Sequence, residues 1–362
     1  MYTSTSKLSN LFFFFFSFFS FFSFFPLITG HEITPYYLIF ILLGYFVSYQ
    51  KDTFKTFLIF LGLLFFLLYL FIFKSLQIFF DVACLSVVFL TVKIFCLIKL
   101  SDRQKIATYI YYLSIATLIY TFLLWAFPVL QVFHVKLLTT REVHSIEMYA
   151  IAKRSTGIAP EPAYMASWII GSWVLICSVL PNLKLKSSII STLGIFFTAS
   201  LSGELMFLLL LLILWSGSFK TLYSLTFFVV LTIGFLFLLG SPILERPLSL
   251  ITFLSSSNSF GIDLLTKIDE LFGSKRISSL TPSFYSLGCG SIFCDVPNTH
   301  GYSYYAELYY KFAPLHLVAI LYLLINIKNR MQLISFICFF SYGPVLNWML
   351  FSGFAGEDDK TL

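Results

Sequence analysis

Long apolar runs alternate with short polar breaks along almost the whole chain. A helix needs roughly 20 apolar residues to cross the hydrocarbon of a bilayer, and about eleven stretches approach that length. They lie at 8–28, 34–50, 55–73, 76–98, 106–128, 163–180, 186–200, 203–217, 219–240, 312–327 and 331–351. The pattern predicts an all-α, polytopic integral membrane protein with about 11 (10–12) transmembrane helices, forming a single membrane domain over residues 1–362.

Two of these stretches need interpretation. The Phe-rich run that opens the chain could be taken for a signal peptide, but 26–30 lacks the small-x-small pattern of a cleavage site, so we expect it to be the first helix and to face lipid. The stretches 186–200 and 203–217 are separated by very few residues. They can form either two tightly connected helices or one broken helix.

Composition and charge support a membrane protein and set its orientation. Apolar residues make up 59% of the 362 residues and charged residues 11%, and the mean hydropathy is +0.90, which leaves too few polar residues to cover a water-facing surface. With the N-terminus in the cytoplasm, the short outer loops carry only Lys74, and the following basic residues lie inside: Lys7, Lys51, Lys55, Lys99, Arg103, Lys105, Lys184, Lys186, Lys220, Lys328 and Arg330. The net charge of +6 is therefore explained by topology, and we expect the bilayer but no nucleic acid as a partner.

This orientation places the two long segments between helices, 129–162 and 241–311, on the outer face. Loops of this length between helices usually carry a function. The second contains a short amphipathic helix near 261–272 that ends at Gly273 and is expected to lie on the membrane surface. It also contains Cys289 and Cys294, which can form a disulfide in an oxidising compartment. A metal site with His300 is the alternative, but no second pair of ligands lies nearby, and we expect no metal and no cofactor.

Charged and aromatic residues in the outer loops suggest a site. Glu161 lies between two prolines, which hold it in a stiff turn, and Arg154 is seven residues upstream, so both side chains can face one cavity. The alternative is a snorkelling arginine and a carboxylate that stabilises a helix start. In the second loop, His300 precedes Gly301 and a tyrosine-rich helix start, which suits sugar binding or proton transfer.

The residues of these loops resemble a known family. Arg154-Ser155-Thr156-Gly157 followed by Glu161-Pro162-Ala163-Tyr164-Met165-Ala166 resembles the R-x-T-G…E-P-S-Y-x-A signature of O-antigen and capsule repeat-unit polymerases (Wzy-type), with Ala163 where a serine is common. Thr198-Ala199-Ser200-Leu201-Ser202-Gly203 is similar to the family's T-x-S-x-T/S-G segment. Gly288-x-Gly290 with His300 is similar to its last outer loop, so the resemblance spans about 154 to 325.

The resemblance implies a glycosyltransferase of the bacterial inner (plasma) membrane. Such enzymes join glycan repeat units carried on a polyprenyl diphosphate, with a chain-length regulator and a flippase as partners. Arginines bind a diphosphate leaving group well, and the candidates are Arg154, Arg246 and Arg276. His300 or Glu161 would accept the proton of the acceptor hydroxyl, and Tyr304 and Tyr305 would stack on sugar faces.

Two other functions fit parts of the sequence. An O-antigen ligase, which transfers glycan to the lipid A core, has the same overall plan and also uses a lone histidine in its last outer loop, but the arginine and Glu161-Pro162 motif favours the polymerase. A polysaccharide transporter or lipid flippase would need ionisable residues inside the membrane. Asp81 and Lys93 are the candidates, and both lie near the ends of the predicted helix 76–98.

Overall fold

The computed structural model describes residues 2–21, 36–48, 87–88, 90–130, 154–159, 162–215, 327–342 and 347–355, together with 252, 253, 255, 321, 324 and 325. Within these residues the regular structure is entirely helical and contains no strand, which confirms the all-α class for this part of the chain. Two of the described helices, α5 (Leu100–Ala126) and α8 (Pro162–Val179), are long and apolar enough to cross a membrane. Shorter apolar helical stretches cover Lys7–Phe21, Tyr37–Ser48 and Met206–Trp215.

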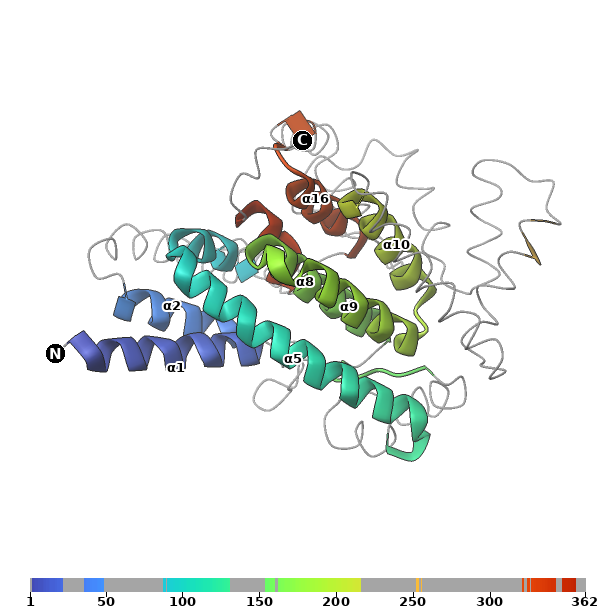
Figure 1. Ribbon diagram of the computed structural model, residues 1–362, viewed down its shortest axis with the longest axis horizontal. Helices are drawn as coiled ribbons and strands as arrows, with labels where there is room; N and C mark the ends of the chain where they lie inside the picture. The colour runs from blue at the N-terminus through green and yellow to red at the C-terminus, as the bar shows by residue number, and fades with distance from the viewer. Residues whose placement is uncertain are drawn as a thin grey trace, which may run out of the picture.

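Helix α8 forms the centre of the bundle. It begins at Pro162, and proline suits the first helical position because the missing N–H has no partner there in any case. Fifteen of its 18 residues are buried, including Trp168 and Trp173, whereas only six of the 27 residues of α5 are buried. In Figure 1, α5 runs as a long diagonal rod, with α8 and α9 beside it in the middle of the molecule.

A tight connection joins α8 to α9 (Lys184–Thr198) through the 3-10 turn η1 (Pro181–Leu183). The short connection makes the two helices antiparallel neighbours, and polar contacts hold their facing sides together. Trp173 Nε1 donates a hydrogen bond to Ser188 Oγ over 2.9 Å, and Cys177 Sγ lies 3.5 Å from Ser187 Oγ. The serines of α9 therefore face the core and not the outside.

The seventh and eighth predicted stretches form two separate helices, α9 and α10 (Leu201–Trp215). Trp173 contacts α9 at Ser188, well before the connection, and also contacts α10 at Phe207, just after it, with ring centroids 5.0 Å apart. A broken but continuous helix could not bring both residues to one side chain. The chain reverses at Ala199-Ser200, so the first of the two alternatives is correct.

The Phe-rich first helix α1 (Tyr2–Phe21) packs against α2 (Tyr37–Ser48) and against the core. Phe19 and Phe40 stack with centroids 4.9 Å apart and planes 3° from parallel. Phe13, Phe16 and Phe21 are fully or almost fully buried, whereas three other large side chains are exposed: Leu8, Leu11 and Phe14. One side of this helix therefore forms part of the core, where the expectation of lipid contact is wrong, and for the exposed side lipid contact stays a prediction.

Buried serines of α1 connect it to the far end of the chain. Ser20 donates from Oγ to the carbonyl of Phe16 (2.7 Å), the usual way a helical serine satisfies its own hydroxyl. The same residue accepts two indole hydrogen bonds, from Trp168 Nε1 to its carbonyl (2.7 Å) and from Trp348 Nε1 to its hydroxyl (2.9 Å). Since buried indole N–H groups require an acceptor, Ser20 fixes both tryptophans against α1.

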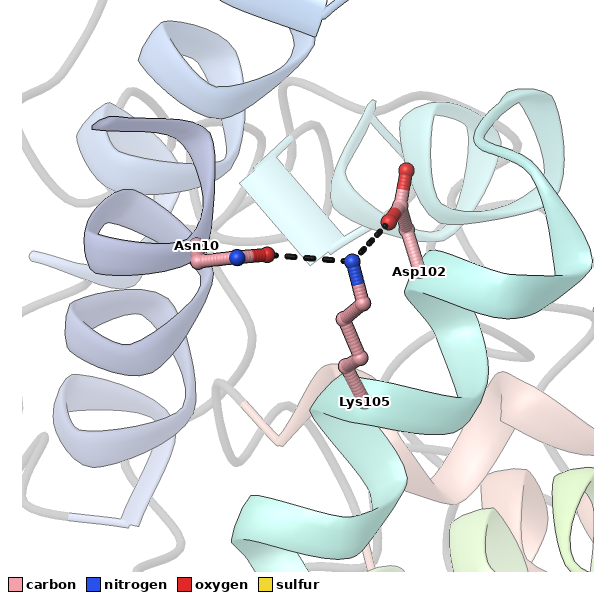
Figure 2. A network of polar contacts seen from close by, with 3 residues as sticks. All are labelled: Asn10, Asp102 and Lys105. Carbon is pink, nitrogen blue, oxygen red and sulfur yellow. Dashed lines mark hydrogen bonds and ion pairs between the residues drawn. The ribbon is translucent and has the colours of Figure 1, made fainter. Parts of the chain in front are cut away.

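Figure 2 shows a second polar connection between α1 and the bundle, at the start of α5. Lys105 Nζ donates to Asn10 Oδ1 and to Asp102 Oδ1, both at 3.0 Å. The group is exposed, so it contributes little stability. It does show that the first half of α1 lies beside the first turn of α5, while Trp168 contacts α1 near its end.

The predicted continuous helix over 331–351 is wrong. Helix α16 (Arg330–Tyr342) ends before Gly343-Pro344, and the chain continues as a 3-10 helix, η3 (Trp348–Ala355). The backbone N–H of Gly353 donates to Ser335 Oγ over 3.0 Å, so η3 runs back along α16 instead of extending it. Proline disfavours helical geometry in the preceding residue, which explains why α16 stops.

Segment η3 fills the middle of the bundle. Trp348, Met349 and Leu350 are buried, and the Trp348 ring lies 5.0 Å from the rings of both Phe16 and Phe95. Just before it, Asn347 Nδ2 donates to the Ser167 carbonyl of α8 over 2.9 Å. The approach is so close that a Cβ atom at Gly171 would lie 2.6 Å from Asn347 Nδ2.

Candidate functional site

The segment Arg154–Ala159 forms a compact turn against the end of α9. Ser155 N–H donates to the Phe197 carbonyl over 3.0 Å, which holds the turn to the last residues of that helix. Inside the turn, Gly157 N–H donates to Ser155 Oγ (3.2 Å) and Ala159 N–H donates to the Thr156 carbonyl (3.1 Å). These bonds fix the backbone that carries Arg154.

Glycine is required at position 157 for two reasons. Its φ is +57°, a left-handed conformation that costs other residues about 1–2 kcal/mol. A Cβ atom there would also lie 2.7 Å from Met165 Sδ of α8 and 2.9 Å from Thr121 Oγ1 of α5. The turn therefore sits directly on α8 and α5, with no space for a side chain at its centre.

Replacing Gly157 with alanine is expected to destabilise the protein by about 2–3 kcal/mol, from backbone strain plus overlap with Met165. Thermal unfolding in detergent measures the change. The Met165→Ala single variant and the double variant complete a double-mutant cycle. In the Met165→Ala background, Gly157→Ala should cost about 1 kcal/mol less, because the overlap is relieved. Equal stabilities of wild type and Gly157→Ala would show that position 157 has more space than the structure gives it.

The connection between α9 and α10 lies beside this turn. Thr198 Oγ1 donates to the Ile195 carbonyl (2.7 Å), and Ala199 adopts a left-handed conformation with φ of 45° while its N–H donates to Phe196 O (3.0 Å). Left-handed residues commonly end helices, but alanine there is strained. Helix α10 then starts, and Glu204 N–H donates to the Ser200 carbonyl over 2.8 Å.

The first turns of α8 and α10 also meet here. A Cβ atom at Gly203 would lie 2.6 Å from Ala166 Cβ, so the two helices approach at a point where both residues are small. Met165, next to Ala166, covers Gly157. Three segments that are far apart in the sequence, 154–159, 163–166 and 197–204, therefore meet at one end of the bundle, which we call the Arg154 end.

Two charged side chains are described at the Arg154 end. The Arg154 side chain is half-buried, with its Nε atom inside the protein, and Glu204 is also half-buried in the first turn of α10. Sequence reasoning identified Arg154 but missed Glu204. The available signal was a single carboxylate at the head of the otherwise uncharged run 205–215.

Buried polar atoms without a hydrogen-bond partner within the described part of the chain occur near these segments. Among them are Thr156 Oγ1, whose residue is completely buried, and Asn347 Oδ1, whose residue is 1% exposed. Leaving such a group without a partner costs about 1–3 kcal/mol. Buried orphans of this kind are uncommon and mark places where a protein binds water or another polar group.

A small cavity lies between α1, α5, α8 and α9. It is lined by Thr117, one turn of α5 before the residue that faces Gly157, Thr121. Its volume of about 10 Å³ is close to what one water molecule needs. The lining residues are Phe21, Ser114, Thr117, Leu118, Ile169, Ser172, Ile190, Ser191 and Gly194. Four of these carry hydroxyl groups, so the bundle interior is polar beneath the Arg154 turn.

Of the residues predicted to form the site, the structure describes Arg154 alone. The others lie outside the described residues: Glu161, Arg246, Arg276, His300, Tyr304 and Tyr305. The predicted amphipathic helix near 261–272 and the cysteines Cys289 and Cys294 are also outside them. Cys96, Cys177 and Cys338 are free thiols on helices, where cysteine serves as a small apolar side chain.

No protein-family model, no curated protein and no solved structure matches the chain. Functional reasoning therefore depends on the residues at the Arg154 end and on the sequence motifs they belong to.

Proposed function

We propose that this chain is a polytopic protein of the bacterial inner membrane that polymerises glycan repeat units on the outer face. The main support is that the motif segments that resemble those of Wzy-type polymerases meet at the Arg154 end. These segments are 154–157, 163–166 and 198–203. The hydrogen bond from Ser155 N–H to Phe197 O and the contact between Gly203 and Ala166 bring them together. Residues that act on one substrate need this proximity.

Charge distribution supports the proposed orientation. In the described part of the chain, seven basic residues lie at or beside the starts of α5, α9 and α16: Lys99, Arg103, Lys105, Lys184, Lys186, Lys328 and Arg330. Lys7 lies in the first half of α1, and Lys93 lies in the helical stretch before α5. Arg330 Nη1 contacts the Leu214 carbonyl near the end of α10, over 3.4 Å, so the start of α16 lies opposite the start of α10. Arg154 is at the other end. Such asymmetry is typical of membrane proteins with a basic cytoplasmic face.

The surface of the bundle supports contact with lipid. Large apolar side chains of α5 and α10 point outward, among them Ile119, Phe122, Leu208 and Leu212. Water-soluble proteins seldom expose such continuous apolar faces. Together with the apolar lengths of α5 and α8, these faces favour a helix bundle that is surrounded by hydrocarbon.

The proposed reaction transfers a growing glycan from its polyprenyl diphosphate to a hydroxyl group of the next repeat unit. The anomeric C–O bond to the diphosphate breaks, the leaving group keeps both electrons, and the hydroxyl oxygen forms the new glycosidic bond. Arg154, with Arg246 and Arg276, stabilises the charge of the diphosphate. His300 or Glu161 accepts the hydroxyl proton, and Tyr304 and Tyr305 stack on the sugars.

Deletion of the gene tests the function directly. Surface polysaccharide of the deletion strain is compared on a gel with that of the parent strain, and we expect the ladder of chain lengths to collapse to core plus one repeat unit. Restoration by a plasmid copy is the control. Polymer that accumulates on its lipid carrier would indicate the ligase instead, and an unchanged ladder would favour the transporter.

A further inference from the structure

Glu204 is a carboxylate at the Arg154 end to which the proposed reaction gives no role. It lies in the first turn of α10, half-buried, and the rest of that helix is apolar through Trp215. The other carboxylate in the described part of the chain, Asp102, lies at the start of α5 and pairs with Lys105 at 3.0 Å. Glu204 is therefore the described carboxylate that shares an end of the bundle with the arginine.

Backbone contacts limit the distance between Glu204 and Arg154. Ser155 is bonded to Phe197, and the three residues from Phe197 to Ser200 reach at most about 11 Å. Glu204 follows Ser200 by one helical turn, a rise of about 5–6 Å. Both side chains are long, so they can reach different parts of one ligand the size of a sugar diphosphate.

The position of Glu204 at a helix start lowers the cost of its charge, because a carboxylate in the first turn interacts favourably with the helix dipole. The dipole does not require an ionisable side chain there. An ionisable group among apolar residues of a membrane helix is costly, and such groups usually mark binding or transport sites.

A second observation indicates a polar ligand at this place. Thr156, next to Arg154 and Ser155 in the turn, is completely buried, and its Oγ1 has no hydrogen-bond partner among the residues described. Gly157, the following residue, lies against Met165, and Ala166 lies against Gly203, which precedes Glu204. The unsatisfied hydroxyl and the carboxylate thus belong to the same group of touching segments.

We propose that Glu204 binds a hydroxyl group of the glycan at the site where Arg154 binds the diphosphate. The assignment rests on the proposed function. Carboxylates accept hydrogen bonds from sugar hydroxyls, and hydrogen bonds to charged groups are the stronger ones. The arginine fixes the charged end of the substrate, and the carboxylate fixes a sugar ring relative to it. Glu204 is a binding residue, and the proton acceptor is a separate group.

The test uses membranes that contain the full-length protein and the lipid-linked repeat unit extracted from a strain that lacks this gene. Transfer is measured for wild type, Glu204→Gln and Glu204→Leu at matched protein levels. Asp102→Asn is the control, because it removes the carboxylate at the opposite end. Thermal unfolding in detergent is recorded for each protein, so that loss of folding is separated from loss of binding.

We expect Glu204→Gln, which keeps an acceptor oxygen, to raise KM for the repeat unit about tenfold with kcat little changed. Glu204→Leu should lower kcat/KM about a hundredfold, as expected when a hydrogen bond to a charged group is lost. Asp102→Asn should behave as wild type. A Glu204→Leu protein with an unchanged KM overturns the assignment while the proposed function stands. Wild-type membranes that form no polymer overturn both.

Discussion

Replacing Arg154 with alanine is expected to reduce polymer formation by about two to three orders of magnitude, the usual effect of removing one group that stabilises developing charge. The backbone beside Arg154 is held by the Ser155 to Phe197 hydrogen bond, and the Nε atom of Arg154 is buried. Arg154→Lys keeps the charge but loses the bidentate geometry, and it should retain only part of the activity. Chain-length distributions on gels and transfer rates in membranes measure both.

The control for Arg154 is Lys186→Ala, which removes an exposed cation near the start of α9, at the opposite end of the bundle. It should leave chain length unchanged. Full-length polymer from Arg154→Ala, with the protein present in membranes at the wild-type level, would contradict the proposed diphosphate contact.

Replacing Gly353 with alanine is expected to produce the largest loss of stability, about 3–5 kcal/mol. The added Cβ would overlap the carbonyl of Met331, and Ser335 Oγ is also in its way. A side chain can rotate away from such overlap, but a helix backbone cannot. The melting temperature in detergent should fall by about 5–10 °C.

Gly44→Ala is the matched control for Gly353→Ala. A Cβ at Gly44 would lie 2.7 Å from Phe13 Cε1, the far end of a side chain that can shift, and alanine favours helix more than glycine does. We expect a change of less than about 1 kcal/mol. Equal melting temperatures for Gly353→Ala and wild type would show that η3 does not contact α16 as closely as described.

The lengths of the apolar runs predicted which described segments are helical better than they predicted where the helices end and how they are connected. They identified α5 and α8, which were predicted at 106–128 and 163–180, because each contains a long run without charge, although α5 begins earlier, at Leu100. They joined 331–342 to the residues after it, since 331–351 is apolar on both sides of Gly343-Pro344. The glycine-proline pair was the available sign that α16 ends, but burial of both parts in one core removes the polar residues that normally mark a connection.

Proximity within the site could not be read from the sequence. The motifs at 154–157 and 198–203 are separated by two helices, and only the antiparallel arrangement of α8 and α9 brings them together. Glu204 was missed because its neighbours made the segment look like an uninterrupted apolar helix. Arg154 was predicted because it belongs to a short charged motif that ends at the two prolines around Glu161.

The contact between Ser20 and Trp348 has a consequence for how the protein is made. The two residues are 328 positions apart, so α1 meets this partner only after a further 328 residues have been synthesised. Until then, the side of α1 that carries Phe16 and Ser20 is not covered by the ring of Trp348. Chains stopped before residue 347 would contain the described helices α1, α2, α5, α8, α9, α10 and α16 and still lack η3, which makes them natural substrates for quality-control proteases.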